Sequence, residues 1–448
     1  MSSFTPHTRD EVESMLGFMG LTSIEQLYDT IPVALQLRRA LDLPEALSEV
    51  EVIDELAAYG KKNRNSTTDL ICFAGGGSYD HDIATVTSTL GLRGEFVTAY
   101  TPYQPEVAQG VLQAIFEFQT MISRISGLAI TNASLYDGGS ALVEAINLAC
   151  AKTRKGKVVL SEAVNPNWRG VAATFAEGPE HEIVTAKVDR DGRTIWPKVD
   201  SNVAAYVVGY PNYLGFIEDI SAVRKLASDS GALLIVAYDP IAISLLKSPG
   251  ELGADIAIAE GQPLGIPLSY GGPYLGLFSV TMDLVRLLPG RLVGETVDTK
   301  NRTSYVTTLR AREQDIRREK ASSNVCTNQT LMAVWAAIQM SWWGKEGFYE
   351  VGRSSLSSRV YLENRLIEEG LIDQRSSAPR FREFPVRFAK NASEVVEAMF
   401  EEGFLAGVAL EGSNAISNFE GSLLIALTER RTRSQIDSYV KSLKEVAK

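Results

Sequence analysis

The chain has 448 residues, of which 45% are hydrophobic and 22% are charged, so it is long enough for two or three domains with well-filled cores. Its formal net charge of −11 argues against a broad surface for nucleic acid or anionic membrane, because those partners need clustered Lys and Arg. No run approaches the roughly 20 apolar residues of a membrane span, and the N-terminus has no basic segment followed by an apolar one. Small molecules and other proteins are the expected partners.

Cysteine and histidine are too sparse for several kinds of site. Cys72, Cys150 and Cys326 are far apart and form no CxxC spacing, so neither a disulfide framework nor a zinc site is expected. The three histidines form no HxxxH or HExxH pair. We therefore expect no metal centre, and a reducing cytoplasm as the compartment.

Residues 1–65 are expected to form a helical arm and not a domain. Thr8 and Glu11 fit a capping box at the start of a first helix, and Thr22 and Glu25 fit the same pattern for a second helix. The segment is too short and too amphipathic to hold a core of much size. Its apolar stripes are expected to lie on a larger body or on a partner chain.

Residues 66–325 are expected to form a large α/β domain. Short apolar runs alternate there with helical stretches, and such runs are typical of strands inside a parallel sheet that helices cover on both faces. Strands are expected at 158–160, 204–208, 233–237 and 256–259, and a helix at 220–230 with Gly231 in the stop position.

Residues 326–448 are expected to form a smaller C-terminal α/β domain that includes a connecting helix. The connecting helix is predicted over 328–343, before Gly344. The following elements are a helix at about 353–369, a strand at 384–388, a helix at about 393–402, strands at 407–410 and 423–427, and a closing helix that reaches Val446.

Asp239 follows the expected strand 233–237, at the edge where open α/β sheets bind ligands. In enzymes that use pyridoxal phosphate (PLP), an aspartate at this place keeps the pyridine nitrogen protonated. Capping of the next turn is the alternative role. A second strand and a Gly/Pro-rich loop follow, where PLP enzymes place their Schiff-base lysine. Residues 260–263 read Glu-Gly-Gln-Pro, so no internal aldimine can form on this chain.

Two glycine-rich segments are weaker signals. Residues 138–140 read Gly-Gly-Ser before an Ala-rich helix, where free N–H groups can bind an anion, although Asp137 would repel phosphate. A plain capped helix start is the alternative. The triple glycine at 75–77 lacks the GxGxxG spacing, so it is not interpreted as a nucleotide loop.

Three later segments carry polar groups with two possible roles each. Residues 98–106 contain two prolines and two tyrosines, which predicts an extended loop that either lines a pocket or interface or packs as a surface turn. Residues 310–320 interleave both charges, which predicts a solvated helix with i,i+4 pairs, of which one or two arginines could face an anion. Residues 321–329 suit helix caps or a ligand-facing loop.

Four motifs occur in one order along the chain: Tyr-Thr-Pro-Tyr-Gln-Pro-Glu at 100–106, Asn-Ala-Ser-Leu-Tyr-Asp-Gly at 132–138, Gly-Ile-Pro-Leu-Ser-Tyr-Gly-Gly-Pro at 265–273, and the run Arg-Glu-Gln-Asp-Ile-Arg-Arg-Glu-Lys-Ala-Ser-Ser-Asn-Val-Cys-Thr-Asn-Gln at 312–329. They closely resemble the motifs of glycine dehydrogenase (decarboxylating), the P-protein family of the glycine cleavage system, and within it the α subunits, or subunits 1. The resemblance spans nearly the whole chain.

The resemblance implies a PLP-dependent transferase of fold type I, with a large, mostly parallel sheet domain and a smaller C-terminal α/β domain. It also implies an enzyme divided between two homologous chains, in which the β chain (subunit 2) carries a His-Lys pair and holds PLP covalently. On this chain Gln262 stands at the place of that lysine, so no covalent cofactor is expected here. The implied assembly is an α2β2 heterotetramer that decarboxylates glycine and passes the aminomethyl group to the lipoyl arm of the H-protein.

The resemblance further suggests that the α chain lends groups to the β-chain site across the interface. The candidates are Tyr100, Tyr103 and Gln104 from the extended loop, and Ser323 and Asn324 from the later one. They would orient substrate or cofactor without forming a covalent bond. The alternative is a structural or docking subunit that contributes nothing to the pocket. An autonomous PLP enzyme is disfavoured because the lysine is missing.

Overall fold

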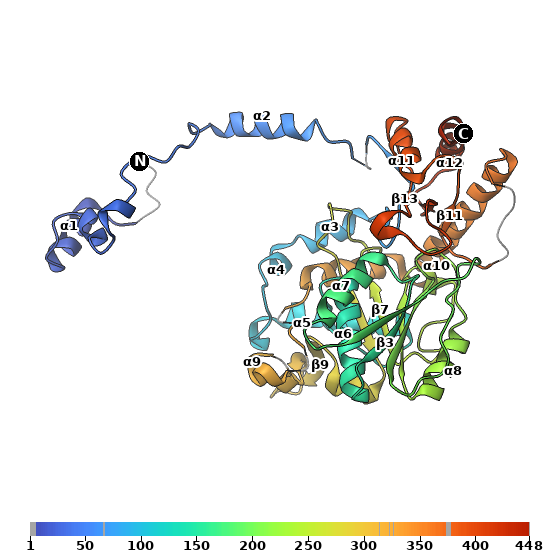
Figure 1. Cartoon of the computed structure of the whole chain (residues 1–448). Helices are drawn as coiled ribbons and strands as arrows, with labels where there is room; N and C mark the ends of the chain where they lie inside the picture. The colour runs from blue at the N-terminus through green and yellow to red at the C-terminus, as the bar shows by residue number, and fades with distance from the viewer. Residues whose placement is uncertain are drawn as a thin grey trace. The chain divides into compact units, whose positions relative to one another are not determined.

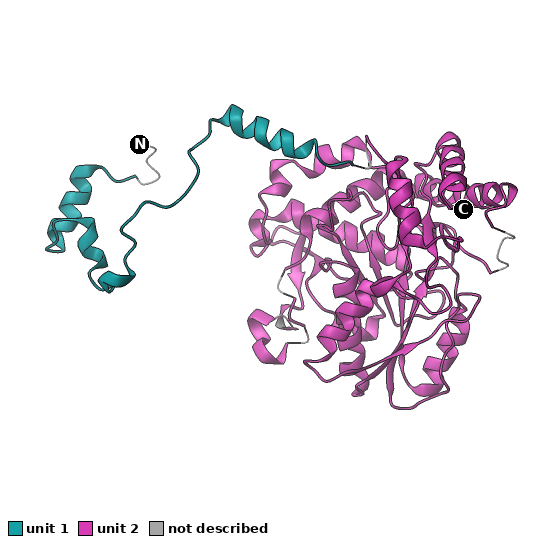
Figure 2. Ribbon diagram, turned by 45° about the horizontal axis from the view of Figure 1, so that its top comes forward, with its two compact units in different colours: residues 1–64 teal, residues 65–448 magenta. Residues whose placement is uncertain are grey.

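The computed structural model describes residues 6–65, 68–312, 314–321, 323–325, 327–372 and 378–447 (Figure 1). The chain divides into two compact units, residues 1–64 and 65–448 (Figure 2). In the described part of the chain, no helix has the length and apolar character needed to cross a membrane. Cys72 and Cys150 are free thiols in buried positions, whereas Cys326 lies outside the described residues.

The N-terminal unit begins with the predicted capping box. In α1 (Arg9–Phe18) the Thr8 hydroxyl accepts the N–H of Glu11, and the Glu11 carboxylate accepts the N–H of Thr8. The second predicted helix is wrong in detail, because it is a single 3-10 segment, η1 (Ile24–Tyr28). Its capping box is closed by Gln26, one residue after the predicted acid, and this shifts the start of the element by one position.

The same unit has almost no core of its own. Its last helix, α2 (Glu49–Gly60), starts at a further capping box, and none of its residues is buried. Among the described residues 6–64, Leu16 alone is buried, while Phe18 is 94% exposed. Local hydrogen bonds at the helix starts therefore define these elements, and their apolar stripes stay uncovered within the unit.

The second unit is built on a seven-stranded sheet in the order β2-β8-β7-β6-β5-β3-β4. Its strands are β2 (Ile130–Thr131), β3 (Lys157–Ser161), β4 (Glu182–Ala186), β5 (Val203–Tyr210), β6 (Leu233–Tyr238), β7 (Ile256–Glu260) and β8 (Gly276–Val280). Strands β4, β3, β5, β6 and β7 are parallel, and β8 is antiparallel to both of its neighbours. The four predicted strands are confirmed as β3, β5, β6 and β7.

Helices cover both faces of this sheet (Figure 1). They are α5 (Gln109–Ser126), α6 (Gly138–Thr153), α7 (Pro166–Ala176), α8 (Ile220–Ser230) and the first part of α10 (Thr330–Glu368). In β5, Tyr206 and Val208 face the core shared with α5, α8 and α10, whereas Ala205 and Val207 face α6 and α7. Every residue of β5 is buried, which is why this strand is apolar throughout and does not alternate. Helix α8 ends at Gly231, as predicted.

The C-terminal elements form a smaller group with its own core. Strands β11 (Glu383–Val386), β14 (Leu423–Ala426) and β13 (Val408–Ala409) make an antiparallel sheet, which packs with α11 (Ala392–Glu401) and α12 (Arg433–Val446). Helix α10 leads into this group and is kinked at Gly344, where the connecting helix is predicted to end. It continues directly after the kink, so the next predicted helix starts earlier than about 353. An early strand, β1 (Ile71–Cys72), pairs with β12 (Phe404–Leu405) of this group. The domain boundary at 325/326 stays a prediction.

The predicted helix over 310–320 is wrong. After the hairpin β9 (Leu292–Val297) and β10 (Thr303–Thr308), the chain makes three short turns, η6 (Arg310–Arg312), α9 (Gln314–Arg317) and η7 (Arg318–Lys320). Leu309 and Arg318 have φ values of 55° and 53°, and such left-handed residues interrupt a right-handed helix. Of the predicted caps in 321–329, Gln329 is the N-cap of α10 and makes no side-chain capping bond, whereas Ser322 and Cys326 lie outside the described residues.

The junction between the large sheet and β11 requires a glycine at position 215. Gly215 has φ +83°, a Cβ added there would lie 2.1 Å from the carbonyl oxygen of Glu383, and its own carbonyl accepts the N–H of Phe381. We therefore expect Gly215→Ala to lower the free energy of unfolding by about 2–4 kcal/mol in urea denaturation. Gly170→Ala in α7, where nothing lies within 4 Å of the added atom, should raise it by up to about 1 kcal/mol. Equal effects of the two substitutions would contradict this role of Gly215.

Candidate functional site

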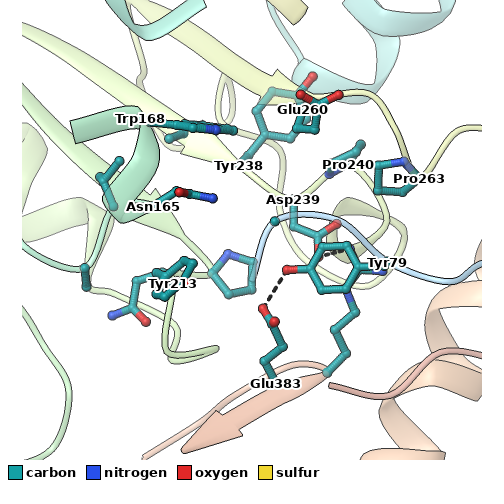
Figure 3. Close-up of a pocket in the computed structure, with 18 residues that line it drawn as sticks. Tyr79, Asn165, Trp168, Tyr213, Tyr238, Asp239, Pro240, Glu260, Pro263 and Glu383 are labelled. Carbon is teal, nitrogen blue, oxygen red and sulfur yellow. Dashed lines mark hydrogen bonds and ion pairs between the residues drawn. The ribbon is translucent and has the colours of Figure 1, made fainter. Parts of the chain in front are cut away.

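A cleft lies where the parallel strands β3, β5, β6 and β7 end (Figure 3). Its cavity has a volume of about 70 Å³, room for a few water molecules. The lining residues come from the segments that follow these strands and from two further parts of the chain: Gly77, Tyr79, Ala163, Val164, Asn165, Trp168, Gly209, Pro211, Asn212, Tyr213, Ala237, Tyr238, Asp239, Pro240, Glu260, Pro263, Arg382 and Glu383. Open α/β sheets bind ligands at this edge, as the sequence predicts for Asp239.

Asp239 has two partners in the structure. One carboxylate oxygen accepts the N–H of Ile241 at 2.9 Å, which is the turn-capping role considered for this residue. The other forms an ion pair with Nη2 of Arg382 at 2.7 Å. The Arg382 side chain is 1% exposed and that of Asp239 is 14% exposed, so the pair is shielded from solvent. The aspartate is therefore engaged from within the chain.

Arg382 is held on its other sides as well. Its guanidinium lies 3.5 Å from the centroid of the Tyr79 ring, a cation–π contact, and it also contacts Nε2 of His81. His81 in turn faces the Glu429 carboxylate, with 2.7 Å between Nδ1 and Oε2. Figure 3 shows the Tyr79 hydroxyl directed at Glu383, to which it donates a hydrogen bond of 2.6 Å.

Glu260 ends β7 and is one of the residues that line the cleft (Figure 3). One oxygen accepts the N–H of Gly138, the first residue of α6, at 3.0 Å. The other accepts the N–H groups of Gln262 at 2.9 Å and Leu275 at 3.0 Å. The same carboxylate therefore binds the start of a helix and both sides of the loop that follows β7.

Gln262, at the place predicted for a Schiff-base lysine, is 2% exposed and fully hydrogen-bonded. Its side-chain oxygen accepts the N–H of Tyr79 at 2.8 Å, and its side-chain nitrogen donates to the carbonyls of Tyr79 at 3.0 Å and Ile266 at 2.8 Å. The amide thus joins two loops, a role that an amine without an acceptor function could fill only in part.

Two buried acids of the cleft have raised pKa values. Burial raises the pKa of Glu260 to about 8, against the lowering effect of its three N–H donors. Burial also raises the pKa of Glu383 to about 7, against hydrogen bonds from the N–H of Gly76 and the hydroxyl of Tyr79. Loss of hydration is the dominant effect on both carboxyls because neither reaches solvent.

The two glycine-rich segments serve close packing around these acids. The α6 start is the capped helix start considered as the alternative, because Asp137 accepts the N–H of Ser140 at 2.7 Å. A Cβ at Gly138 would lie 1.9 Å from the Trp168 ring. In the triple glycine, Gly76 donates its N–H to Glu383 at 2.6 Å. The sequence does not reveal Glu383 as the partner of Gly76, because the two residues are 307 positions apart.

The predicted site residues Tyr100, Tyr103 and Gln104 share one exposed loop. Tyr100 is 83% exposed and Tyr103 48%, and Gln104 is also exposed. The Tyr103 ring lies between two guanidinium groups, 5.3 Å from Arg291 and 5.5 Å from Arg310. Its hydroxyl lies 3.4 Å from Nη2 of Arg291, which acts as the donor. The loop is therefore anchored through Tyr103 while Tyr100 projects outward.

Ser323 and Asn324 lie next to α6, and their contacts differ from those that Tyr103 makes with Arg291 and Arg310. Burial raises the pKa of Glu144 to about 7, and a hydrogen bond with the Ser323 side chain acts in the opposite direction. The Ser323 hydroxyl also accepts the N–H of Val325 at 3.0 Å. Asn324 is exposed and lines a surface hollow with Cys150 and His181. Neither residue lines the Asp239 cleft, and neither do the three residues of the tyrosine loop.

Metal ligation is not indicated in the parts of the chain that the structure describes. There, no three His, Cys, Asp or Glu side chains are grouped so that they could hold an ion.

The family model described as "Glycine cleavage system P-protein" matches residues 2–443 of the chain. The chain belongs to the glycine cleavage system P-protein family. Among curated P-proteins, it is 45% identical over 443 residues to "Probable glycine dehydrogenase (decarboxylating) subunit 1" of Carboxydothermus hydrogenoformans, covering 98% of this chain and 99% of the relative. It is 41% identical to the protein of the same description in Brevibacillus brevis, covering 99% of each.

The solved structures agree with this membership. A crystal structure of glycine decarboxylase (P-protein) in inhibitor-bound form superposes with a TM-score of 0.90, at 40% identity, over 99% of this chain and 100% of the other. A cysteine desulfurase from Thermococcus onnurineus superposes with a TM-score of 0.62 at 11% identity, over 86% of this chain and 97% of the other, which shows a shared fold only. The predicted PLP-dependent transferase fold is confirmed.

P-proteins are PLP-dependent, but the cleft of this chain does not fit the coenzyme. Residues 260–263 offer no amine, and the amide of Gln262 is used for internal hydrogen bonds. Asp239 is paired with Arg382, and the first N–H of α6 is taken by Glu260. A covalently held PLP therefore has no attachment point at residues 260–263, and the two groups that would bind its ring nitrogen and its phosphate already have partners.

The raised pKa values of Glu260 and Glu383 predict how stability changes with pH. Both lie above the ordinary value of 4.5, so the folded chain binds these protons more tightly than the unfolded chain does. The stabilisation is complete below about pH 4.5 and is lost as the pH rises through about 7 for Glu383 and about 8 for Glu260.

We therefore expect Glu260→Gln, which cannot release a proton, to be most destabilised relative to the wild type near about pH 5 and least near about pH 9 in urea denaturation. Glu383→Gln should follow the same trend, with its change complete about one pH unit earlier. A stability difference that stays constant over this range would contradict the assignment.

Proposed function

We propose that this chain is subunit 1, the α subunit, of glycine dehydrogenase (decarboxylating) and that it works only together with a lysine-bearing β subunit. The assembled enzyme would decarboxylate glycine with PLP held covalently by the β chain, and pass the aminomethyl group to the lipoyl arm of the H-protein. The observation that carries the proposal is Gln262, a buried and fully hydrogen-bonded amide at the lysine position of an otherwise complete family fold. Full-length relatives described as subunit 1 support it.

The tyrosine loop is proposed as the part of this chain that reaches the partner's site. Tyr103 combines a fixed position between Arg291 and Arg310 with an exposed fraction of 48%, so its hydroxyl is oriented yet accessible. Tyr100 and Gln104 are exposed beside it. Polar groups held in this way can orient a substrate or cofactor without a covalent bond.

Ser323 and Asn324 are proposed to act at the same interface, by different means. The Ser323 hydroxyl is already used by Glu144 and by the N–H of Val325, so its contacts favour a role in holding the loop. Asn324 has an exposed side chain that is available to a partner. Neither residue would form a covalent bond with substrate.

The N-terminal unit is proposed to be covered by the partner subunit in an α2β2 assembly. Many of its described apolar residues are exposed, among them Phe18 at 94%, Leu35 at 75% and Leu43 at 71%. Burial of each such side chain is worth about 1.5–3 kcal/mol, which a neighbouring chain can supply. The cytoplasm is the proposed compartment, consistent with the free thiols of Cys72 and Cys150.

A structural or docking subunit remains the second candidate function. The internally occupied cleft favours it, because a chain that has lost its own cofactor site can persist solely as a support for its partner. The two candidates differ in one respect, since only the first predicts that a change in the tyrosine loop stops turnover while assembly stays intact.

We expect Tyr103→Phe to lower the rate of glycine–carbon dioxide exchange by the reconstituted enzyme about 10-fold, the effect of one lost hydrogen bond. Tyr349→Phe is a matched control, because Tyr349 is also 48% exposed but lies in α10, and it should keep full activity. Sedimentation should show unchanged assembly for both variants. Full exchange activity of Tyr103→Phe would instead favour the docking subunit.

Leu35→Asp should weaken association with the β subunit about 10- to 100-fold, because a charge replaces an apolar contact. The association constant would be measured by analytical ultracentrifugation of the two full-length chains. Leu35→Met keeps the apolar surface and should associate like the wild type. Normal assembly of the aspartate variant would remove the proposed role of this part of the N-terminal unit.

A further inference from the structure

We infer that the cleft at the strand ends is closed to PLP, even as a non-covalent ligand, because Glu260 occupies the place of the coenzyme's phosphate and Arg382 the place of its ring nitrogen. This goes beyond the missing lysine, whose loss alone would still allow a phosphate and an aromatic ring to bind. It rests on the family fold and not on the proposed role of the β subunit.

The phosphate side of the cleft is the start of α6. A helix N-terminus binds phosphate through its free N–H groups, and in this 16-residue helix the N–H of Gly138 already donates to Glu260 at 3.0 Å. Asp137 caps the same turn through the N–H of Ser140. The Trp168 ring packs on Gly138 so closely that not even a Cβ would fit. An incoming phosphate would meet two acids and an indole where it needs N–H donors.

The ring side of the cleft is Asp239. One oxygen of this aspartate accepts the N–H of Ile241 and the other is paired with Arg382, so a pyridinium nitrogen could reach the carboxylate only by displacing the guanidinium or by sharing an oxygen with one of these two partners. Displacement of Arg382 by a coenzyme would leave its guanidinium, 1% exposed, without its carboxylate partner. An uncompensated buried charge is strongly unfavourable, so the ring cannot compete.

The internal occupants also hold one another in place. Arg382 is stacked on the Tyr79 ring, and the Tyr79 backbone is bonded on both its N–H and its carbonyl by Gln262. The Tyr79 hydroxyl is bonded by Glu383. Arg382 therefore cannot swing away unless the loop around Tyr79 also moves. The former cofactor cleft acts as a junction that ties β6 and β7 to the segment before β11.

The experiment uses the full-length chain without its partner. Pyridoxamine 5′-phosphate, which cannot react with lysines, is titrated into the wild type by calorimetry, and we expect no saturable binding. PLP is then added to Gln262→Lys and to the triple variant Gln262→Lys/Glu260→Ala/Arg382→Met, followed by borohydride reduction and peptide mapping. We expect label at residue 262 only in the triple variant, with surface lysines labelled equally in both.

A matched control distinguishes the specific removal of Glu260 and Arg382 from a general loss of packing in the protein. Gln262→Lys/Glu144→Ala removes another buried glutamate, which lies on α6 but does not bind its first N–H, and it should stay unlabelled at residue 262. Circular dichroism and thermal melting establish that each variant is folded.

Three outcomes would overturn the inference. The first is label at residue 262 in Gln262→Lys alone to the extent seen in the triple variant. The second is a folded triple variant that stays unlabelled. The third is saturable binding of pyridoxamine 5′-phosphate to the wild type that Asp239→Asn abolishes, and this test stands even if the triple variant does not fold. None of these uses glycine turnover, so the proposed subunit role is tested separately.

Discussion

The ion pair between Asp239 and Arg382 connects the two cores of the larger unit. Asp239 directly follows the central strand β6, and Arg382 directly precedes β11, the first strand of the C-terminal sheet. A buried pair of this kind adds little net stability over an apolar contact, but the loss of either partner leaves a charge without compensation. The geometry of the cleft therefore depends on both residues together, and the surrounding groups Tyr79, Gln262 and His81 are arranged around that pair.

The cleft keeps the place where this fold binds ligands but fills part of it with the chain's own side chains. The strands end at one edge, and the helix after β2 begins there, but side chains of the chain itself engage Asp239 and the first N–H of that helix. Because unpaired buried polar groups are costly, a site that loses its ligand must be refilled from within or by water. Here the side chains of Glu260 and Arg382 take this place. The unfavourable burial of charge is seen in the raised pKa values of Glu260 and Glu383.

The parts of the fold that could be predicted from the sequence are those fixed by local patterns. Apolar runs indicated β3, β5, β6 and β7, and a stop glycine indicated the end of α8. The helix expected over 310–320 failed because Leu309, just before it, and Arg318, within it, adopt left-handed conformations, for which composition carries no signal. The two-residue strands β1, β2 and β12 are too short for any periodicity, and only tertiary pairing defines them.

The site was predictable in the same uneven way. Asp239 and Gln262 were visible because they lie at fixed places after two apolar strands. Arg382 lies 143 positions after Asp239 (382 − 239), and no spacing rule joins residues so far apart. The partners of Tyr103 are even more distant, Arg291 at 188 positions (291 − 103) and Arg310 at 207 (310 − 103). Contacts between residues so far apart in the sequence could therefore be found only in the structure.

The pairing of β1 with β12 has a consequence for biosynthesis. Ile71 is the register partner of Phe404, so 333 residues (404 − 71) must be made between the two halves of this ladder. At a synthesis rate of about 5–20 residues per second, β1 can pair with β12 only on the order of 20–70 s after it has been made. During that interval the apolar side chain of Phe73, which is fully buried in the folded protein, lacks its native contacts. The nascent chain therefore exposes a surface that chaperones can bind.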